Sequence, residues 1–258
     1  MLKKILKNDI LTKNGNQGGG KMRFKMYFEL EYPKIDIQYR KSIISYIKHA
    51  IQEYDENLFN QMYSGNNKKT FTWATILSKP KFEQEKIILQ DNQFSILFSA
   101  YDYLYALHIY NAFFNQKLKK FSLNQNSMTL KNIVMIPEKE VNTNKIQIKM
   151  VSPIICRNHN KETLKDMYYS FEKEEFEKYI RINILEQMQH EKLDSSLLEG
   201  FKITPLNSKK IIVKLYEKKI ESSIGCFELE GKKQLLNYLY KAGIGTKKAM
   251  GFGLFEII

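Results

Sequence analysis

The chain has 258 residues, 43% hydrophobic and 13% aromatic, so it can bury a substantial core as one large domain or two small ones. No run of about 18 apolar residues occurs, which excludes a membrane-spanning helix. The two cysteines, Cys156 and Cys226, lack the spacing of a disulfide framework or a zinc site, so we expect no metal or other cofactor and a reducing cytoplasm. The net charge of +13 favours a polyanionic partner.

The first 21 residues differ from the rest of the chain. Leu2 to Leu11 is compatible with one short helix, whereas Thr12 to Lys21 has the composition of a linker. The stretch Gln17-Gly-Gly-Gly-Lys-Met22 can be encoded by a purine-rich ribosome-binding site that precedes a start codon. We therefore expect residues 1–21 to be an extension outside the fold, disordered or non-native, with Met22 as the natural start.

The first half of the remaining chain predicts one βαββαβ unit with insertions. Alternating apolar residues indicate strands, and an apolar stripe at helical spacing indicates the first helix. The elements are expected at 23–32 (strand), 38–54 and 56–63 (helices), 70–77, 82–89 and 94–100 (strands), 102–116 (helix) and 129–137 (strand).

The second half repeats this order of elements. Periodicity is lost over Glu138 to Lys145, which predicts a boundary between two domains near residues 138–144. The elements are expected at 145–151 (strand), 172–189 (helix), 201–204, 211–216 and 225–228 (strands), 234–240 (helix) and 252–258 (strand).

A glycine-rich stretch connects the last predicted helix to the last strand. It contains four of the twelve glycines, at Gly243, Gly245, Gly251 and Gly253, around the pair Lys247 and Lys248. A turn of this kind can aim successive backbone N–H groups at an anion, although a flexible connection is the simpler interpretation. Neither a Walker loop nor a dinucleotide fingerprint fits, because the glycines follow a helix and precede a strand. This pattern favours contact with the phosphates of a polyanion.

The spacing Gly-Ile-Gly-x5-Gly-Phe-Gly before a short final strand resembles the C-terminal loop of the repeat-associated RNA-binding (RAMP) superfamily of CRISPR systems. The likeness is strongest to endoribonucleases that cut repeat RNA into guide RNAs. It extends from Met22 over most of the chain, including Lys69-Thr-Phe-Thr-Trp73 and Ser152-Pro-Ile-Ile-Cys-Arg157. The resemblance implies an α+β fold of two tandem ferredoxin-like (RRM-like) domains, here 22–140 and 141–258. It also implies that the protein binds CRISPR repeat RNA and that a multi-subunit CRISPR effector complex is a further partner. We expect the protein to be a monomer or a homodimer.

Metal-independent cleavage of RNA uses the substrate's own 2′-hydroxyl and needs a base, an acid and a cation beside the phosphate. Histidine suits the acid or base, and the chain has four: His49, His108, His159 and His190. We favour His49, off the apolar stripe of the first helix, with Tyr46 expected on the same face. His108 fits packing, His190 a helix end and His159 a loop. The resemblance adds that catalytic residues lie on or just after this helix.

One departure from the family's pattern concerns the loop before the second strand, where many members carry a histidine. The corresponding segment here has none, and we expect Tyr63, Lys68 and Lys69 to orient the phosphate or to substitute in part. RNA binding is expected from Lys247, Lys248 and the four glycines, with Arg157 and Lys68 as further basic contacts. A non-catalytic RNA-binding subunit and an unrelated nucleotide enzyme are the rival interpretations.

Overall fold

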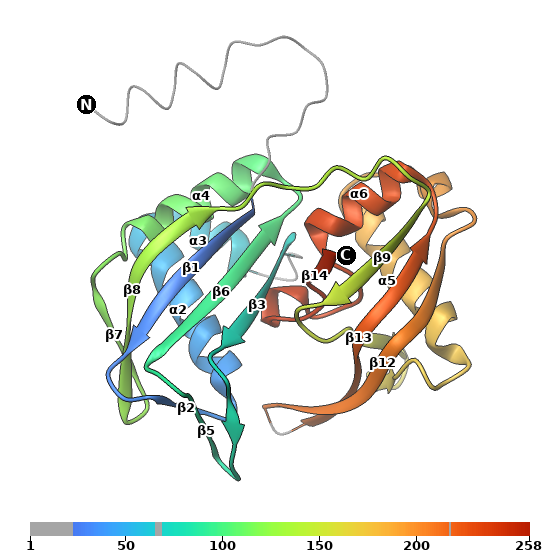
Figure 1. Cartoon of the computed structure of the whole chain (residues 1–258). Helices are drawn as coiled ribbons and strands as arrows, with labels where there is room; N and C mark the ends of the chain where they lie inside the picture. Colours follow the sequence, from blue (N-terminus) through green and yellow to red (C-terminus); the bar gives the residue numbers. More distant parts are fainter. Residues whose placement is uncertain (1–22, 65–68, 217) are drawn as a thin grey trace.

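The computed structural model describes residues 23–64, 69–216 and 218–258, which form two α+β units lying side by side (Figure 1). In each unit an antiparallel sheet carries its helices on one face. The expected extension 1–21 and the side chain of Lys68 lie outside the described residues. Among the described helices, none is both long and apolar enough to cross a membrane.

The N-terminal unit is a ferredoxin-like sheet extended by one strand. Its strand order is β3-β6-β1-β8-β7, and β1 pairs antiparallel with both β6 and β8. The connections β1–α2–β3 and β6–α4–β8 reproduce βαββαβ. The elements are β1 (Arg23–Leu30), β2 (Lys34–Asp36), α2 (Tyr39–Tyr54), α3 (Glu56–Tyr63), β3 (Phe71–Leu77), β4 (Lys81–Phe82), β5 (Lys86–Ile88), β6 (Gln93–Ala100), α4 (Tyr103–Phe114), β7 (Lys120–Leu123) and β8 (Asn126–Met135).

The C-terminal unit repeats this topology with strand order β12-β13-β9-β14. A hairpin of β10 and β11 is inserted between the first strand and the first helix. The elements are β9 (Lys145–Met150), β10 (Cys156–His159), β11 (Asp166–Tyr169), α5 (Glu175–His190), the 3₁₀ turn η1 (Ser195–Leu198), β12 (Lys202–Leu215), β13 (Lys218–Glu230), α6 (Lys233–Ala242), the 3₁₀ turn η2 (Lys248–Met250) and β14 (Phe255–Ile257). The predicted fold class is therefore confirmed.

Local sequence explains most of these elements. Strand β1 alternates buried and more exposed side chains, and α2 buries an apolar stripe that includes Ile43, Ile47 and Ile51. Helices α3 and α4 begin at Asp55 and Asp102, whose carboxylates accept a backbone N–H three residues on. These capping bonds explain why both helix starts were predictable to within a residue.

Three predictions about strands were wrong. The strand expected at 82–89 is two short strands, β4 and β5, which form a separate sheet with β2. The segments 201–204 and 211–216 are one long strand, β12, that continues across an irregularity between Pro205 and Ser208. The hairpins that involve β7, β10 and β11 were not predicted, because β7 has only four residues and the sequences of β10 and β11 lack an apolar alternation.

The two units pack against each other along strand β3 and the start of β1. Thr72 Oγ1 donates to the carbonyl of Phe252 at 2.8 Å, and Trp73 Nε1 donates to that of Ala249 at 3.0 Å. Arg23 is fully buried and donates to the carbonyl of Phe255 and to Glu256 Oε1, both at 2.8 Å. The glycine-rich stretch is thereby held at the junction between the two units.

Candidate nucleic-acid interface at the domain junction

The four glycines of the loop are buried, and each has a positive φ between 76° and 86°. A Cβ at Gly251 would come within 2.7 Å of the Trp73 ring, and one at Gly253 within 2.1 Å of the Ile244 carbonyl oxygen. Only glycine combines this backbone with such close packing. The glycines thus pack the loop against the protein itself, which corrects the expectation that they are open to a ligand.

The loop lines a cavity of about 210 Å³ between the units, mainly through side chains and, among its glycines, through Gly245. Lys69 contributes from the N-terminal unit just before β3, and Arg157 contributes from β10 of the C-terminal unit. The charged and imidazole side chains on its walls are Lys69, Arg157, Glu186, His190, Glu191, Lys247 and Lys248. The cavity therefore gathers four of the cations that the sequence predicted for RNA or for its cleavage.

The two loop lysines have different surroundings. Lys247 is half-buried, and burial followed by the charge of Arg157 lowers its pKa, although Asp166 opposes this. Lys248 is only 9% exposed, and its charge acts on Glu191, whose pKa burial raises. Lys247 therefore stands nearer to a phosphate in the cavity, whereas Lys248 serves partly to balance a buried carboxyl group.

Tyr63 and Lys69 lie together, as the sequence analysis expected of residues acting on one phosphate. The Lys69 ammonium is 4.7 Å from the centre of the Tyr63 ring, and Lys48 approaches the same ring at 5.0 Å. Burial, and then the charge of Lys48, lowers the pKa of Lys69. Burial raises the pKa of Tyr63 to about 12, so its hydroxyl keeps its proton at neutral pH.

His49 and Tyr46 do not join this group. Tyr46 is 2% exposed and packs in the core against Phe28, so its expected place on the polar face is wrong. The exposed ring of His49 lies 5.5 Å from that of Phe121 in β7. Strand β7 is the edge of the sheet opposite to β3, which holds the glycine-rich loop. His49 therefore packs beside β7, whereas its neighbour Lys48 reaches the Tyr63 ring that Lys69 also contacts.

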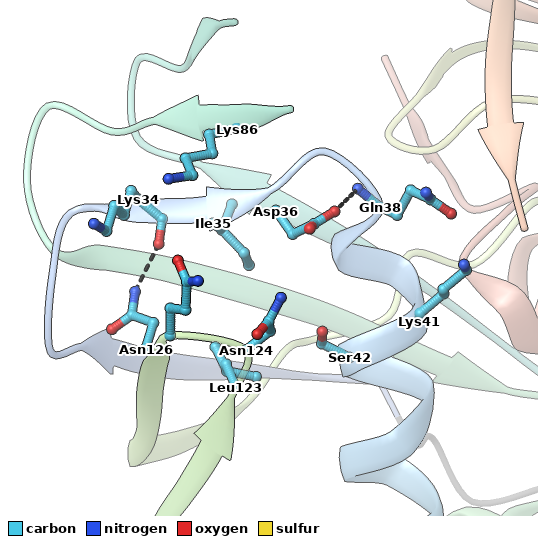
Figure 2. A pocket seen from close by; sticks show the side chains of 11 residues that line it. Lys34, Ile35, Asp36, Gln38, Lys41, Ser42, Lys86, Leu123, Asn124 and Asn126 are labelled. Carbon is cyan, nitrogen blue, oxygen red and sulfur yellow. Dashed lines mark hydrogen bonds between the residues drawn. The ribbon is translucent and has the colours of Figure 1, made fainter. Parts of the chain in front are cut away.

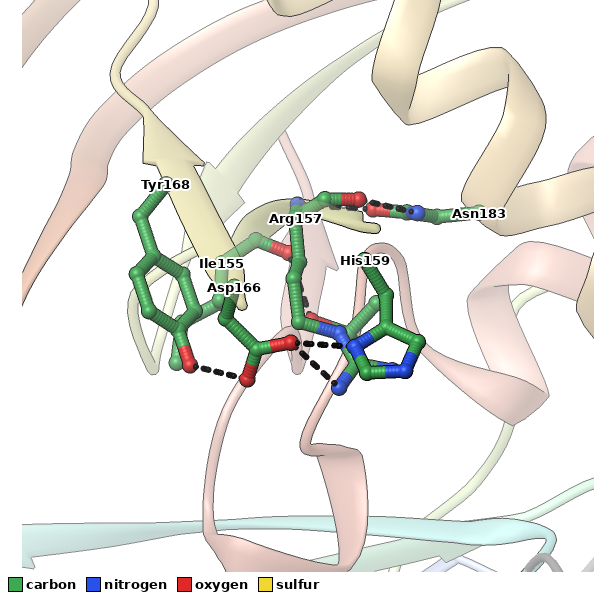
Figure 3. Close-up of polar contacts among 7 residues, drawn as sticks. Ile155, Arg157, His159, Asp166, Tyr168 and Asn183 are labelled. Carbon is green, nitrogen blue, oxygen red and sulfur yellow. Dashed lines mark hydrogen bonds and ion pairs between the residues drawn. The ribbon is translucent and has the colours of Figure 1, made fainter. Parts of the chain in front are cut away.

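The β10–β11 hairpin carries a polar cluster beside the cavity (Figure 3). Asp166 accepts from His159 Nδ1 at 2.8 Å, from Tyr168 Oη at 3.0 Å and from Arg157 Nη1 at 3.3 Å. Asn183 of α5 bonds the backbone of Arg157 through both its amide atoms. Sequence reasoning missed Asp166 and Tyr168, because only strand pairing brings them beside Arg157 and His159.

A second cavity, of about 240 Å³, lies in the N-terminal unit near the start of α2 (Figure 2). Its wall includes Lys34, Lys41 and Lys86. Asn126 there donates to the Lys34 carbonyl at 2.7 Å, and Asp36 accepts from the Gln38 backbone at 2.6 Å. These hydrogen bonds stabilise turns of the N-terminal unit. The cavity at the domain junction, which gathers cations from both units, is therefore the stronger candidate for the nucleic-acid interface.

Comparison with known proteins agrees with the resemblance drawn from the sequence. Residues 136–257 match the family model described as CRISPR associated protein Cas6, C-terminal. No curated protein matches the chain by sequence.

Solved structures share the fold over nearly the whole chain. A Cas6-related protein from Pyrococcus furiosus superposes with a TM-score of 0.82 at 20% identity, covering 93% of this chain and 99% of that one. A RAMP protein described as binding different RNA substrates gives 0.80 at 19% identity, with 92% and 99% covered. A Cas6 product complex gives 0.69 at 12% identity, with 93% and 100% covered.

Proposed function

We propose that the chain is a CRISPR-associated protein of the RAMP type that binds CRISPR repeat RNA at the domain junction and cleaves it, because its C-terminal region matches the Cas6 model and its fold matches Cas6-related and RAMP structures. The carrying observation is the cavity in which Lys69 of one unit faces Arg157 and Lys247 of the other. A repeat-RNA strand that enters it meets cations from both units, which fixes the place of one phosphate.

The proposed reaction needs no metal ion. The 2′-oxygen attacks the adjacent phosphorus, the bond from phosphorus to the 5′-oxygen breaks, and the ends are a 2′,3′-cyclic phosphate and a 5′-hydroxyl. Arg157 and Lys247 balance the charge of the pentacoordinate phosphorane. The uncharged amine of Lys69, favoured by its lowered pKa, accepts the proton of the 2′-hydroxyl. Tyr63 positions Lys69, whose Nζ lies 4.7 Å from the centre of the tyrosine ring.

The rival function is that of a non-catalytic RNA-binding subunit. It is favoured by one observation, namely that the exposed ring of His49 packs beside Phe121 of β7, whereas Lys69 packs on the Tyr63 ring. Both functions need the same phosphate contacts, so binding by itself does not distinguish them.

The test of cleavage uses labelled repeat RNA of the same genome, incubated with the protein in EDTA. Cleavage with 2′,3′-cyclic phosphate ends is expected, and a single 2′-deoxy nucleotide at the cleaved linkage should stop it. Binding without cleavage would support the rival function. Cleavage that persists on the deoxy substrate, or that requires magnesium, would contradict the mechanism.

The test of binding compares the two loop lysines. Lys247→Ala should weaken repeat binding and reduce the salt slope by about one phosphate contact. Lys248→Ala should instead act mainly on stability, because the charge of Lys248 stabilises the partly buried carboxylate of Glu191. Salt-dependent binding isotherms and urea unfolding of both variants check this. An unchanged slope for Lys247→Ala would remove the loop from the interface.

A further inference from the structure

The imidazole of His159 is held in a fixed orientation. Its Nδ1 lies 2.8 Å from Asp166 Oδ1, and the two residues face each other across the hairpin register. The Asp166 side chain is 15% exposed and that of His159 is 39% exposed. With Nδ1 bonded to the carboxylate, Nε2 is the ring nitrogen that remains for another molecule (Figure 3). This arrangement of carboxylate and imidazole is the one that enzymes use to orient a proton carrier.

The same hairpin is tied to the walls of the cavity. Arg157 and His159 lie two residues apart on β10, so both side chains project from one face, and both contact Asp166. The glycine-rich loop bonds to the start of this strand through Thr246 N, which donates to the Ile155 carbonyl at 2.9 Å. His159 is therefore fixed beside the cation that we assign to the phosphate.

We propose that His159, oriented by Asp166, is the general acid that protonates the 5′-oxygen of the cleaved linkage, an assignment that rests on the proposed function. As the bond from phosphorus to the 5′-oxygen breaks, the electron pair of that bond stays on the oxygen. The Nε2 proton of the imidazolium passes to this oxygen and yields the 5′-hydroxyl, while the neutral imidazole regains a proton from water. The 2′-hydroxyl proton goes to Lys69, so both protons of the reaction are accounted for.

The carboxylate that orients His159 is itself surrounded by charged and hydrogen-bonding groups. Asp166 supplies a negative charge, and Arg157 and Lys247 supply positive ones. Burial raises the pKa of Asp166, but hydrogen bonds from His159 and Tyr168 and the charges of Arg157 and Lys247 together lower it below its ordinary value. Asp166 thus remains a carboxylate at neutral pH and continues to accept the hydrogen bond from Nδ1 of His159.

The test uses two versions of the repeat RNA at the linkage that the unmodified protein cleaves. One is ordinary RNA, and in the other sulfur replaces the bridging 5′-oxygen, since a thiolate leaves without being protonated. His159→Ala should slow single-turnover cleavage of the ordinary RNA by about 10²- to 10⁴-fold. The sulfur substrate should be cleaved at nearly the unmodified rate, with little change in RNA affinity or melting temperature.

Asp166→Asn tests the positioning role, and His190→Gln is the control. A positioning role predicts slower cleavage of ordinary RNA and normal cleavage of the sulfur substrate, whereas a purely structural role would slow both. His190 lies on the cavity wall, at the end of α5. Its replacement should leave the ratio of the two rates unchanged.

Three results would overturn the assignment. The first is that His159→Ala cleaves ordinary RNA at the normal rate. The second is that His159→Ala cleaves both substrates more slowly by the same factor. The third is that His190→Gln, and not His159→Ala, is slow on ordinary RNA but normal on the sulfur substrate. In each of these cases the unmodified protein still yields 2′,3′-cyclic ends in EDTA, and the proposed function stands. If the unmodified protein leaves both RNAs intact in EDTA, the proposed function fails and this assignment fails with it.

Discussion

At the scale of the single residue, burial decides which polar side chain can do chemistry. Tyr46 and Lys69 were both expected at the catalytic site. Tyr46 is enclosed by aromatic rings, whereas Lys69 lies on the wall of the junction cavity. Partial burial of an amine favours its neutral form, which is the form that accepts a proton.

This distinction predicts the effect of replacing Lys69. Lys69→Arg keeps the charge but cannot accept a proton, so it should slow cleavage about as much as Lys69→Ala does, by roughly 10²-fold or more. RNA affinity should fall only for Lys69→Ala. Because the pKa of Lys69 is lowered, the rate should rise with pH and level off below the pH at which an ordinary lysine becomes neutral.

Single-turnover rates across a pH series and binding isotherms check this prediction. Lys81→Arg, at a side chain that is 80% exposed in β4, is the control and should change neither quantity. A full rate for Lys69→Arg would show that Lys69 contributes only its charge.

At the scale of the element, the glycine-rich loop joins the two units as well as lining the cavity. Its backbone follows the surface formed by Thr72, Trp73 and Ile155, and its carbonyl groups accept the donors of β3. Lys247 adopts the left-handed conformation within it, at φ 55°. The backbone that carries Lys247 is therefore fixed by contacts with both units.

Alanine substitutions at two glycines with similar backbone conformations distinguish the cost of backbone strain from the cost of overpacking. Gly251→Ala adds a Cβ against the Trp73 ring at φ 86°, whereas Gly200→Ala adds one at φ 69° with nothing within 4 Å. Both should lose about 1–2 kcal/mol to the backbone, and Gly251→Ala should lose about 1–3 kcal/mol more to overpacking. Urea unfolding measures both. Equal losses would show that the loop moves away from Trp73 at no cost.

At the scale of the whole molecule, Arg23 connects the first strand to the last. Its guanidinium donates to the carbonyl of Phe255 and to Glu256 in β14, and it lies 4.6 Å from the centre of the Tyr240 ring. A buried arginine is stable only while its donors are paired. The position of the two units, and hence the shape of the cavity between them, depends on this side chain.

Replacement of Arg23 should therefore affect stability and cleavage together. Arg23→Met fills part of the space but leaves buried acceptors unpaired, which should lower the free energy of unfolding by about 2–4 kcal/mol. Glu256→Gln is the comparison variant, because its amide oxygen can still accept from the guanidinium while the negative charge is lost, and it should cost less than Arg23→Met. Calorimetry and single-turnover cleavage measure the two effects. Equal losses for the two variants would contradict the central role of Arg23.

Much of the fold follows from local pattern. The order of strands and helices in both units is confirmed, and the helix over 56–63 was predicted with the bounds that the structure has. Apolar periodicity and capping residues act over a few residues, so they can be read along the chain. The break expected within β12 was wrong because pairing with β13 continues across Pro205, and only the partner strand supplies that continuity.

The sequence by itself determined the element order, the two-unit fold class, the surplus of positive charge and the grouping of Tyr63 with Lys69. Tertiary structure decided that the four glycines are buried, that His49 packs beside β7, and that Asp166 orients His159. The physical reason is distance along the chain. A periodic pattern reports on neighbours within a turn or two, whereas Asp166 meets His159 through strand pairing, and Gly251 meets Trp73 only when the two units pack.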